Sequence, residues 1–139
     1  MRAFLYFLLT LSLFFFLNQS FAQMQHSHGQ KFIEAKQPFP SVDIKITKDT
    51  KEGYNLQIIS KNFKFVPEKI NKANTSNEGH AHLYINGKKN RIYSEWYHIS
   101  KDQLSQTLNQ IRVTLNSNDH SEYVVSSRPI EAIGVIKLD

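Results

Sequence analysis

The 139-residue chain contains no cysteine. This absence excludes disulfides, thiolate nucleophiles, cysteine-ligated zinc, iron–sulfur clusters and a blue-copper centre with a cysteine ligand. Beyond the first 22 residues the only methionine is Met24, which argues against a Cu(I) site built on thioethers. The sequence also lacks paired carboxylates, a nucleophile elbow and a phosphate-binding glycine loop, so we predict that the protein is not an enzyme.

The chain has one long apolar run, and it lies at the N-terminus. Arg2 precedes fifteen mostly apolar residues over 3–17, and the small residues Ser20 and Ala22 stand where a signal peptidase recognises its substrate. The run is shorter than the roughly 20 residues that a membrane-spanning helix needs. These features predict a signal peptide over 1–22, and therefore a periplasmic or secreted protein with no membrane span after cleavage.

Charge and polarity divide the rest of the chain into a tail and one domain. The formal net charge is +5, but the lysines are scattered, so we predict no nucleic-acid partner. Residues 23–40 are polar and carry Met24, His26 and His28, which indicates a flexible tail. The remaining residues, 41–139, are enough for one domain with its own core.

Strict alternation of apolar and polar residues indicates β-strands in this domain. Examples are the segments 42–47, 80–85 and 111–115, and Asn86-Gly87 is a strong hairpin turn signal. The segment 91–99 then returns as the partner strand of 80–85. About seven such segments, without a repeat, a heptad or a long helix, predict an antiparallel β-sandwich of immunoglobulin-like or cupredoxin-like type.

His80 and His82 are the first candidate metal ligands. Residues two apart in a strand point the same way, with Cα atoms about 6.5 Å apart, so both imidazoles can reach one ion. The same spacing also occurs on surface strands without any function. Up-and-down threading of the following strands would bring His98 and His120 to the same end of the sandwich. His98 shares the parity of Trp96, so a core position is its alternative.

The donor set indicates which metal such a site would prefer. Imidazoles suit Cu(II) and Zn(II), and Cu(II) has the higher intrinsic affinity. Asp119 or Glu95 is a candidate oxygen ligand or a partner that orients an imidazole, while a plain turn-capping role is the alternative for Asp119. In the tail, Met24, His26 and His28 form a candidate accessory site, with a solvated tail as the alternative.

Several segments resemble a mostly uncharacterised family of small exported bacterial domains with an immunoglobulin-like or cupredoxin-like sandwich. The segment 62–68 (NFKFVPE) is similar to the Asn-Phe-x-Phe-x-Pro stretch of cupredoxin-like domains. Segments 79–87 (GHAHLYING), 96–98 (WYH) and 113–121 (VTLNSNDHS) carry the Gly-His-x-His-Leu and Asn-Asp-His motifs of that family. The resemblance implies binding of copper or another divalent metal.

These observations lead to two functional hypotheses. The first is an exported metal-binding protein that acts as a carrier, buffer or chaperone for Cu(II), with a periplasmic or envelope protein as a possible partner. Its affinity should weaken below about pH 6, as imidazoles become protonated. The second is a non-catalytic binding module, in which Tyr84 and Tyr93 contact a protein or glycan of the cell envelope and the histidines are incidental.

Overall fold

The computed structural model describes residues 29–138, which form two β-sheets packed as a sandwich. The predicted all-β sandwich is therefore confirmed. The predicted signal peptide over 1–22 lies outside the described residues, as do Met24, His26 and His28 of the tail.

Eleven strands occur between residues 29 and 138, more than the predicted seven because several contain only two or three residues. In chain order they are β1 (Phe32–Glu34), β2 (Ser41–Lys48), β3 (Tyr54–Lys61), β4 (Lys64–Phe65), β5 (Glu78–Ile85), β6 (Lys88–Ile92), β7 (Trp96–Ile99), β8 (Leu108–Asn116), β9 (Glu122–Val125), β10 (Arg128–Pro129) and β11 (Glu131–Lys137). Two short 3₁₀ turns, η2 (Pro67–Lys69) and η3 (Lys101–Gln103), are the helical elements among these residues. Neither is long enough to cross a membrane.

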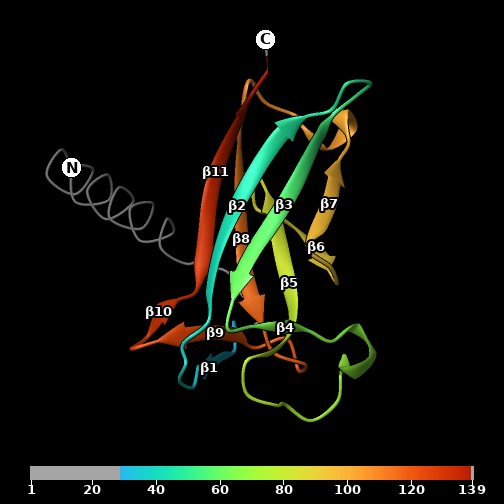
Figure 1. Cartoon of the computed structure of the whole chain (residues 1–139). Coiled ribbons are helices and arrows are strands. Elements are labelled where there is room, and N and C mark those ends of the chain that lie inside the picture. The colour runs from blue at the N-terminus through green and yellow to red at the C-terminus, as the bar shows by residue number, and fades with distance from the viewer. Residues whose placement is uncertain (1–28, 139) are drawn as a thin grey trace, which may run out of the picture.

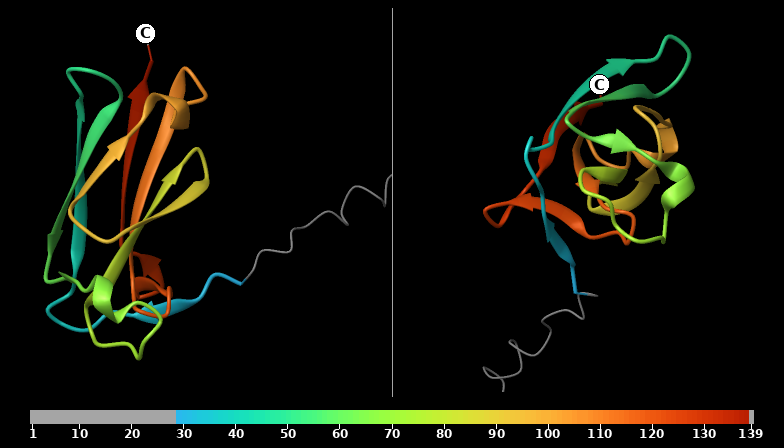
Figure 2. Two further views of the ribbon diagram at one scale, coloured as in Figure 1. Left: turned by 90° about the vertical axis from the view of Figure 1, so that its right-hand side faces the viewer. Right: turned by 60° about the horizontal axis from the view of Figure 1, so that its bottom comes forward.

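The two sheets differ in size. The larger sheet follows the order β1-β9-β8-β5-β4, with β6 added to β5, β10 to β9 and β11 to β8. The smaller sheet has the order β2-β3-β7 and faces the larger one across the core (Figures 1 and 2). Most pairs are antiparallel, whereas β1–β9 and β4–β5 are parallel.

Alternation along the strands builds the core between the sheets. Leu56 and Ile58 of β3 are fully buried and belong to one apolar cluster with Leu83 of β5 and Val113 of β8. Each such side chain stabilises the fold by about 2 kcal/mol through burial. This packing determines which face of β5 points inward, and it leaves His80 and His82 on the opposite face.

Residues 32–34 join the larger sheet, so the prediction of a flexible tail over 23–40 is wrong for this part of the segment. β1 runs parallel to β9, with Phe32 opposite Glu122, and Ala35 is buried in a second apolar cluster. The exposed edge of β9 offers backbone hydrogen-bond partners that a short apolar segment can use. The order of strands in this part of the sheet places the chain near residue 31 beside the end of β8.

Candidate metal centre

Three histidines from two elements converge at one end of the larger sheet. His80 and His82 project from β5, and His120 lies in the turn between β8 and β9. The Nε2 atom of His80 lies 2.9 Å from Nε2 of His82 and 2.9 Å from Nδ1 of His120. One possible ligand atom from each ring lies within 4.8 Å of the other two, so the cluster can hold a metal ion.

The register of β5 and β8 positions all three rings. His80 is opposite Asn116, after which β8 turns toward β9. The Asn116 side-chain amide donates to the carbonyl of His120 at 3.3 Å, and the His120 amide donates to the carbonyl of Ser117 at 2.9 Å. These contacts hold His120 at a φ of +69°, a left-handed conformation that is uncommon for a residue with a side chain. The turn thus directs the His120 ring back over β5.

Hydrogen bonds alone do not satisfy the three rings. A ring nitrogen has a single in-plane position, which carries either one proton or one lone pair. His80 Nε2 nevertheless approaches two other ring nitrogens at hydrogen-bond distance, while its Nδ1 is buried and has no partner among residues 29–138. A purely structural histidine in a core would have both nitrogens paired. A cation bound by one lone pair from each ring would account for the convergence on Nε2, which is the sense in which this cluster could hold a metal ion.

Asn71 fixes the tautomer of His120. The His120 Nε2 atom lies 2.8 Å from the Asn71 side-chain oxygen, which accepts a hydrogen bond but cannot donate one. The proton is therefore on Nε2, and the Nδ1 lone pair faces His80. A partner of this kind is typical of histidines that bind metals. The sequence carries no signal for this role, because Asn71 lies in a polar loop 49 residues away from His120.

The site keeps its imidazoles neutral. His80 and His82 are 0 % and 2 % exposed, and burial lowers the pKa of His80 to about 4 and that of His82 to about 3. Burial also lowers the pKa of His120. The neighbouring positive charges of Lys89 and Arg91 lower all three pKa values further. Neutral imidazoles are the form that binds metals, so the rings need not lose protons near neutral pH.

His98 is not part of the cluster, so the prediction that it reaches the same end is wrong. The chain reverses between β6 and β7, and β7 joins the smaller sheet, with His98 opposite Asn55 at the start of β3. The cluster lies instead near β4, which follows the far end of β3 (Figure 1). His98 is exposed, and its Nδ1 contacts the Asn55 side-chain oxygen at 3.0 Å.

The two acidic candidates do not face the ligand nitrogens. Asp119 accepts hydrogen bonds from the Ser117 hydroxyl at 2.6 Å and from the Ser121 amide at 3.1 Å, which is the turn-capping alternative. These bonds hold the pKa of the Asp119 carboxyl well below its usual range. Glu95 is exposed in the segment before β7, where its backbone carbonyl accepts a hydrogen bond from the Ile58 amide.

Comparison with known proteins adds no assignment. No family model matches the chain, and searches of curated proteins and of solved structures gave no match.

Proposed function

We propose that this protein binds one Cu(II) ion through His80, His82 and His120. The observation that carries the proposal is the approach of three neutral imidazole nitrogens to one point, with His80 Nε2 at 2.9 Å from both of the others. The cluster supplies imidazole nitrogen and no sulfur, which suits Cu(II) and Zn(II) among biological metals.

The spacing of the nitrogens favours copper over zinc. Two ligands at right angles, each about 2.0–2.1 Å from an ion, are about 2.9 Å apart, whereas tetrahedral ligands are about 3.3 Å apart. Both contacts of His80 Nε2 are 2.9 Å, and the three ligand atoms lie within 4.8 Å of one another. The two short spacings are those of neighbouring ligands in the tetragonal geometry that Cu(II) prefers.

The proposed role is a carrier, buffer or chaperone rather than an enzyme. The predicted signal peptide and the resemblance to exported domains support a location in the periplasm or outside the cell. Lowered pKa values for the three rings also support retention of metal in mildly acidic surroundings, below the pH of about 6 expected from unperturbed histidine.

Calorimetric titration of residues 23–139 with Cu(II) and Zn(II) tests the proposal. We expect one-to-one binding, tighter for Cu(II), that is lost in the double variant His80→Ala/His82→Ala. His98→Ala is the matched control, because it removes an imidazole from the other end of the sandwich. Equal affinity of the double variant and of the control would refute the proposal, provided that circular dichroism shows both to be folded.

A binding module is the second candidate, and a specific surface favours it. Trp96 and Tyr93 are 58 % and 41 % exposed beside a hollow of about 530 Å³ that Phe65 and Pro67 also line. Flat aromatic rings of this kind suit a glycan or a peptide. Tyr84, in contrast, packs against the Arg112 guanidinium, whose central carbon lies 4.9 Å from the ring centre. Ligand binding that persists with chelator and disappears in Trp96→Ala would favour this candidate.

A further inference from the structure

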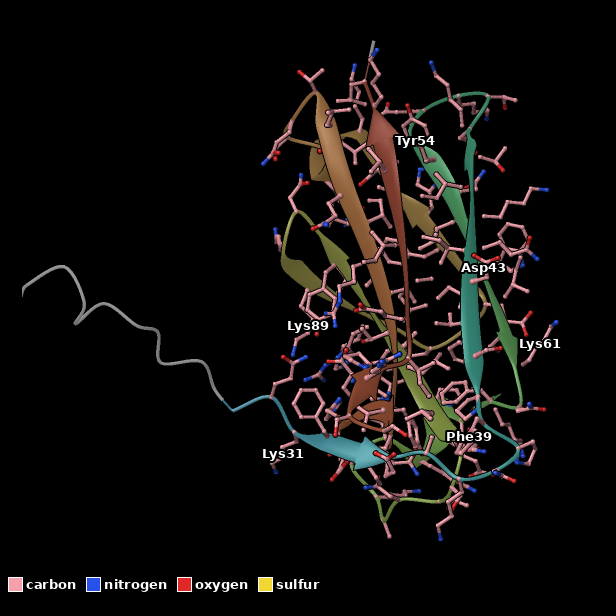
Figure 3. All side chains as sticks on the ribbon, turned by 90° about the vertical axis from the view of Figure 1, so that its left-hand side faces the viewer. Lys31, Phe39, Asp43, Tyr54, Lys61 and Lys89 are labelled. Atoms are coloured by element: carbon pink, nitrogen blue, oxygen red, sulfur yellow. The ribbon has the colours of Figure 1, made fainter. Side chains whose placement is uncertain are left out.

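A cavity of about 460 Å³ lies beside the histidine cluster. His82 and His120 form part of its wall. Its charged lining residues are Lys31, Lys89 and Arg112 together with Asp119 and Glu122. Lys31 and Lys89 lie on the same side of the molecule (Figure 3). Since a water molecule occupies about 30 Å³, the space accommodates a small polyatomic ligand next to a metal ion.

The surroundings of the cluster carry unneutralised positive charge. Arg91 is directly opposite His82 in the β5–β6 pair, and Lys89 is opposite Tyr84, so both project from the face that carries the cluster. Neither Lys89 nor Arg91 forms an ion pair with any residue between 29 and 138. Their charges act on all three histidine rings, in agreement with this placement.

The residues between 29 and 138 supply no negative ligand to balance a metal ion at this position. In the described part of the chain the ligand group contains three histidines and no carboxylate. Asp119 is held by its own turn, and Glu122 forms an ion pair with Arg112 at 2.5 Å. A divalent ion on three neutral imidazoles would keep both of its charges, next to Lys89 and Arg91. Such an arrangement needs a counter-charge from outside the chain.

We propose that the site binds its metal together with a small oxyanion. This inference rests on the proposed function and adds a second ligand to it. The oxyanion occupies the cavity, provides an anionic oxygen to the metal and lies against Lys31 and Lys89. Three protein ligands leave at least one coordination position open on either Cu(II) or Zn(II). Acetate, bicarbonate and phosphate share the required chemistry, since each combines negative charge with several acceptor oxygens.

Cu(II) titrations with and without oxyanion test this inference. Residues 23–139 are titrated in millimolar acetate, bicarbonate or phosphate, and each is compared with perchlorate at equal ionic strength. We expect at least one oxyanion to raise the affinity of the wild-type protein about tenfold and to shift the visible absorption band of the bound Cu(II). The oxyanion that raises the Cu(II) affinity most identifies the chemical class, carboxylate, carbonate or phosphate, that the cavity prefers.

Lys89→Gln tests the role of the cavity, with Lys88→Gln as its matched control. Lys88 is opposite Ile85 and does not line the cavity. In perchlorate Lys89→Gln should bind Cu(II) more tightly than wild type, because a repelling charge is gone. When the oxyanion replaces perchlorate, the increase in Cu(II) affinity should be smaller for Lys89→Gln than for Lys88→Gln. Competition of the free oxyanion for Cu(II) affects both variants equally and therefore cancels.

The possible failures are distinguishable. Tight one-to-one Cu(II) binding with no gain from any oxyanion would overturn the inference and leave the metal site intact. Equal gains for Lys88→Gln and Lys89→Gln would overturn it in the same way. Cu(II) binding that is unaffected in His120→Gln, a change at a partly exposed turn residue, would overturn the metal site and the oxyanion together.

Discussion

Acid should destabilise the metal-free protein at a pH where its carboxylates are still charged. The folded pKa is about 4 for His80 and about 3 for His82, below the ordinary value of 6.5 that applies to the unfolded chain. Between the folded pKa values and pH 6.5, the unfolded chain takes up protons on these histidines and the folded protein does not. The contribution of the neutral rings to the free energy of unfolding is therefore fully present above pH 6.5, and it is lost as the pH falls toward the folded pKa values.

The expected magnitude follows from the two shifts. Each ring changes the free energy of unfolding by up to about 1.4 kcal/mol per pH unit below 6.5. Allowing for partial protonation near pH 6.5, the two rings together cost about 4 kcal/mol between pH 7 and pH 5. This is a large part of the roughly 5–15 kcal/mol that stabilises a domain. Asp119, with its lowered pKa and ordinary value of 3.8, loses its contribution only at lower pH.

Urea unfolding at pH 7, 6 and 5 in the presence of a chelator measures this loss. Circular dichroism of the β-sheet is a suitable signal. His82→Gln removes one titrating ring and should reduce the loss between pH 7 and pH 5 to about half, or roughly 2 kcal/mol. A free energy of unfolding that does not change between pH 7 and pH 5, or a loss that is undiminished in His82→Gln, would show that the buried rings do not remain neutral in the folded protein.

Three further predictions concern the surroundings of the cluster. Asn71→Ala removes the acceptor that fixes a ligand tautomer and should weaken Cu(II) binding about tenfold in calorimetric titration. It should also lower the melting temperature modestly, because Asn71 has a φ of +62° that alanine tolerates less well. An unchanged affinity would contradict the assigned tautomer. Gly79→Ala places a Cβ 1.9 Å from the Asn116 carbonyl oxygen, so chemical denaturation should show a free energy of unfolding lower by about 3 kcal/mol or more. Gly87→Ala, whose Cβ meets no atom within 4 Å, should lose about 1 kcal/mol. Equal losses would argue against the tight β5–β8 contact. A chain of residues 38–139 lacks β1 and should melt at a lower temperature than residues 29–139. Equal melting temperatures would show that β1 contributes nothing to stability.

The sandwich was predictable because the alternation of apolar and polar residues along a strand reflects which of its side chains are buried. The apolar residues of 42–47 and 111–115 follow period two and lie between the two sheets in the structure. The pairing of β5 with β6 across Asn86-Gly87 was also predictable, because this turn strongly favours a hairpin. Local sequence thus determined the fold class and placed His80 and His82 on one face of one strand.

The errors arise where tertiary contacts override a local pattern. The segment 91–99 reads as one strand, yet the chain reverses within it and β7 pairs with β3, which separates His98 from the cluster. β1 forms because β9 presents a free edge with which it can pair. The three residues of β1 alone do not reveal that such an edge lies next to them. The convergence of His120 was anticipated from threading. The contribution of Asn71 was not, because an amide in a polar loop gives no signal of the side chain that it orients.

Electron paramagnetic resonance of the Cu(II)-loaded protein measures directly which side chains bind the metal ion. Residues 29–139 are the best sample, because they retain the described fold and exclude the histidines of the tail. We expect a single Cu(II) species with nitrogen couplings from three imidazoles. One coupling should be lost in each of His80→Gln, His82→Gln and His120→Gln, and none in His98→Gln. An unchanged spectrum in the first three variants would show that His80, His82 and His120 do not bind the Cu(II) ion.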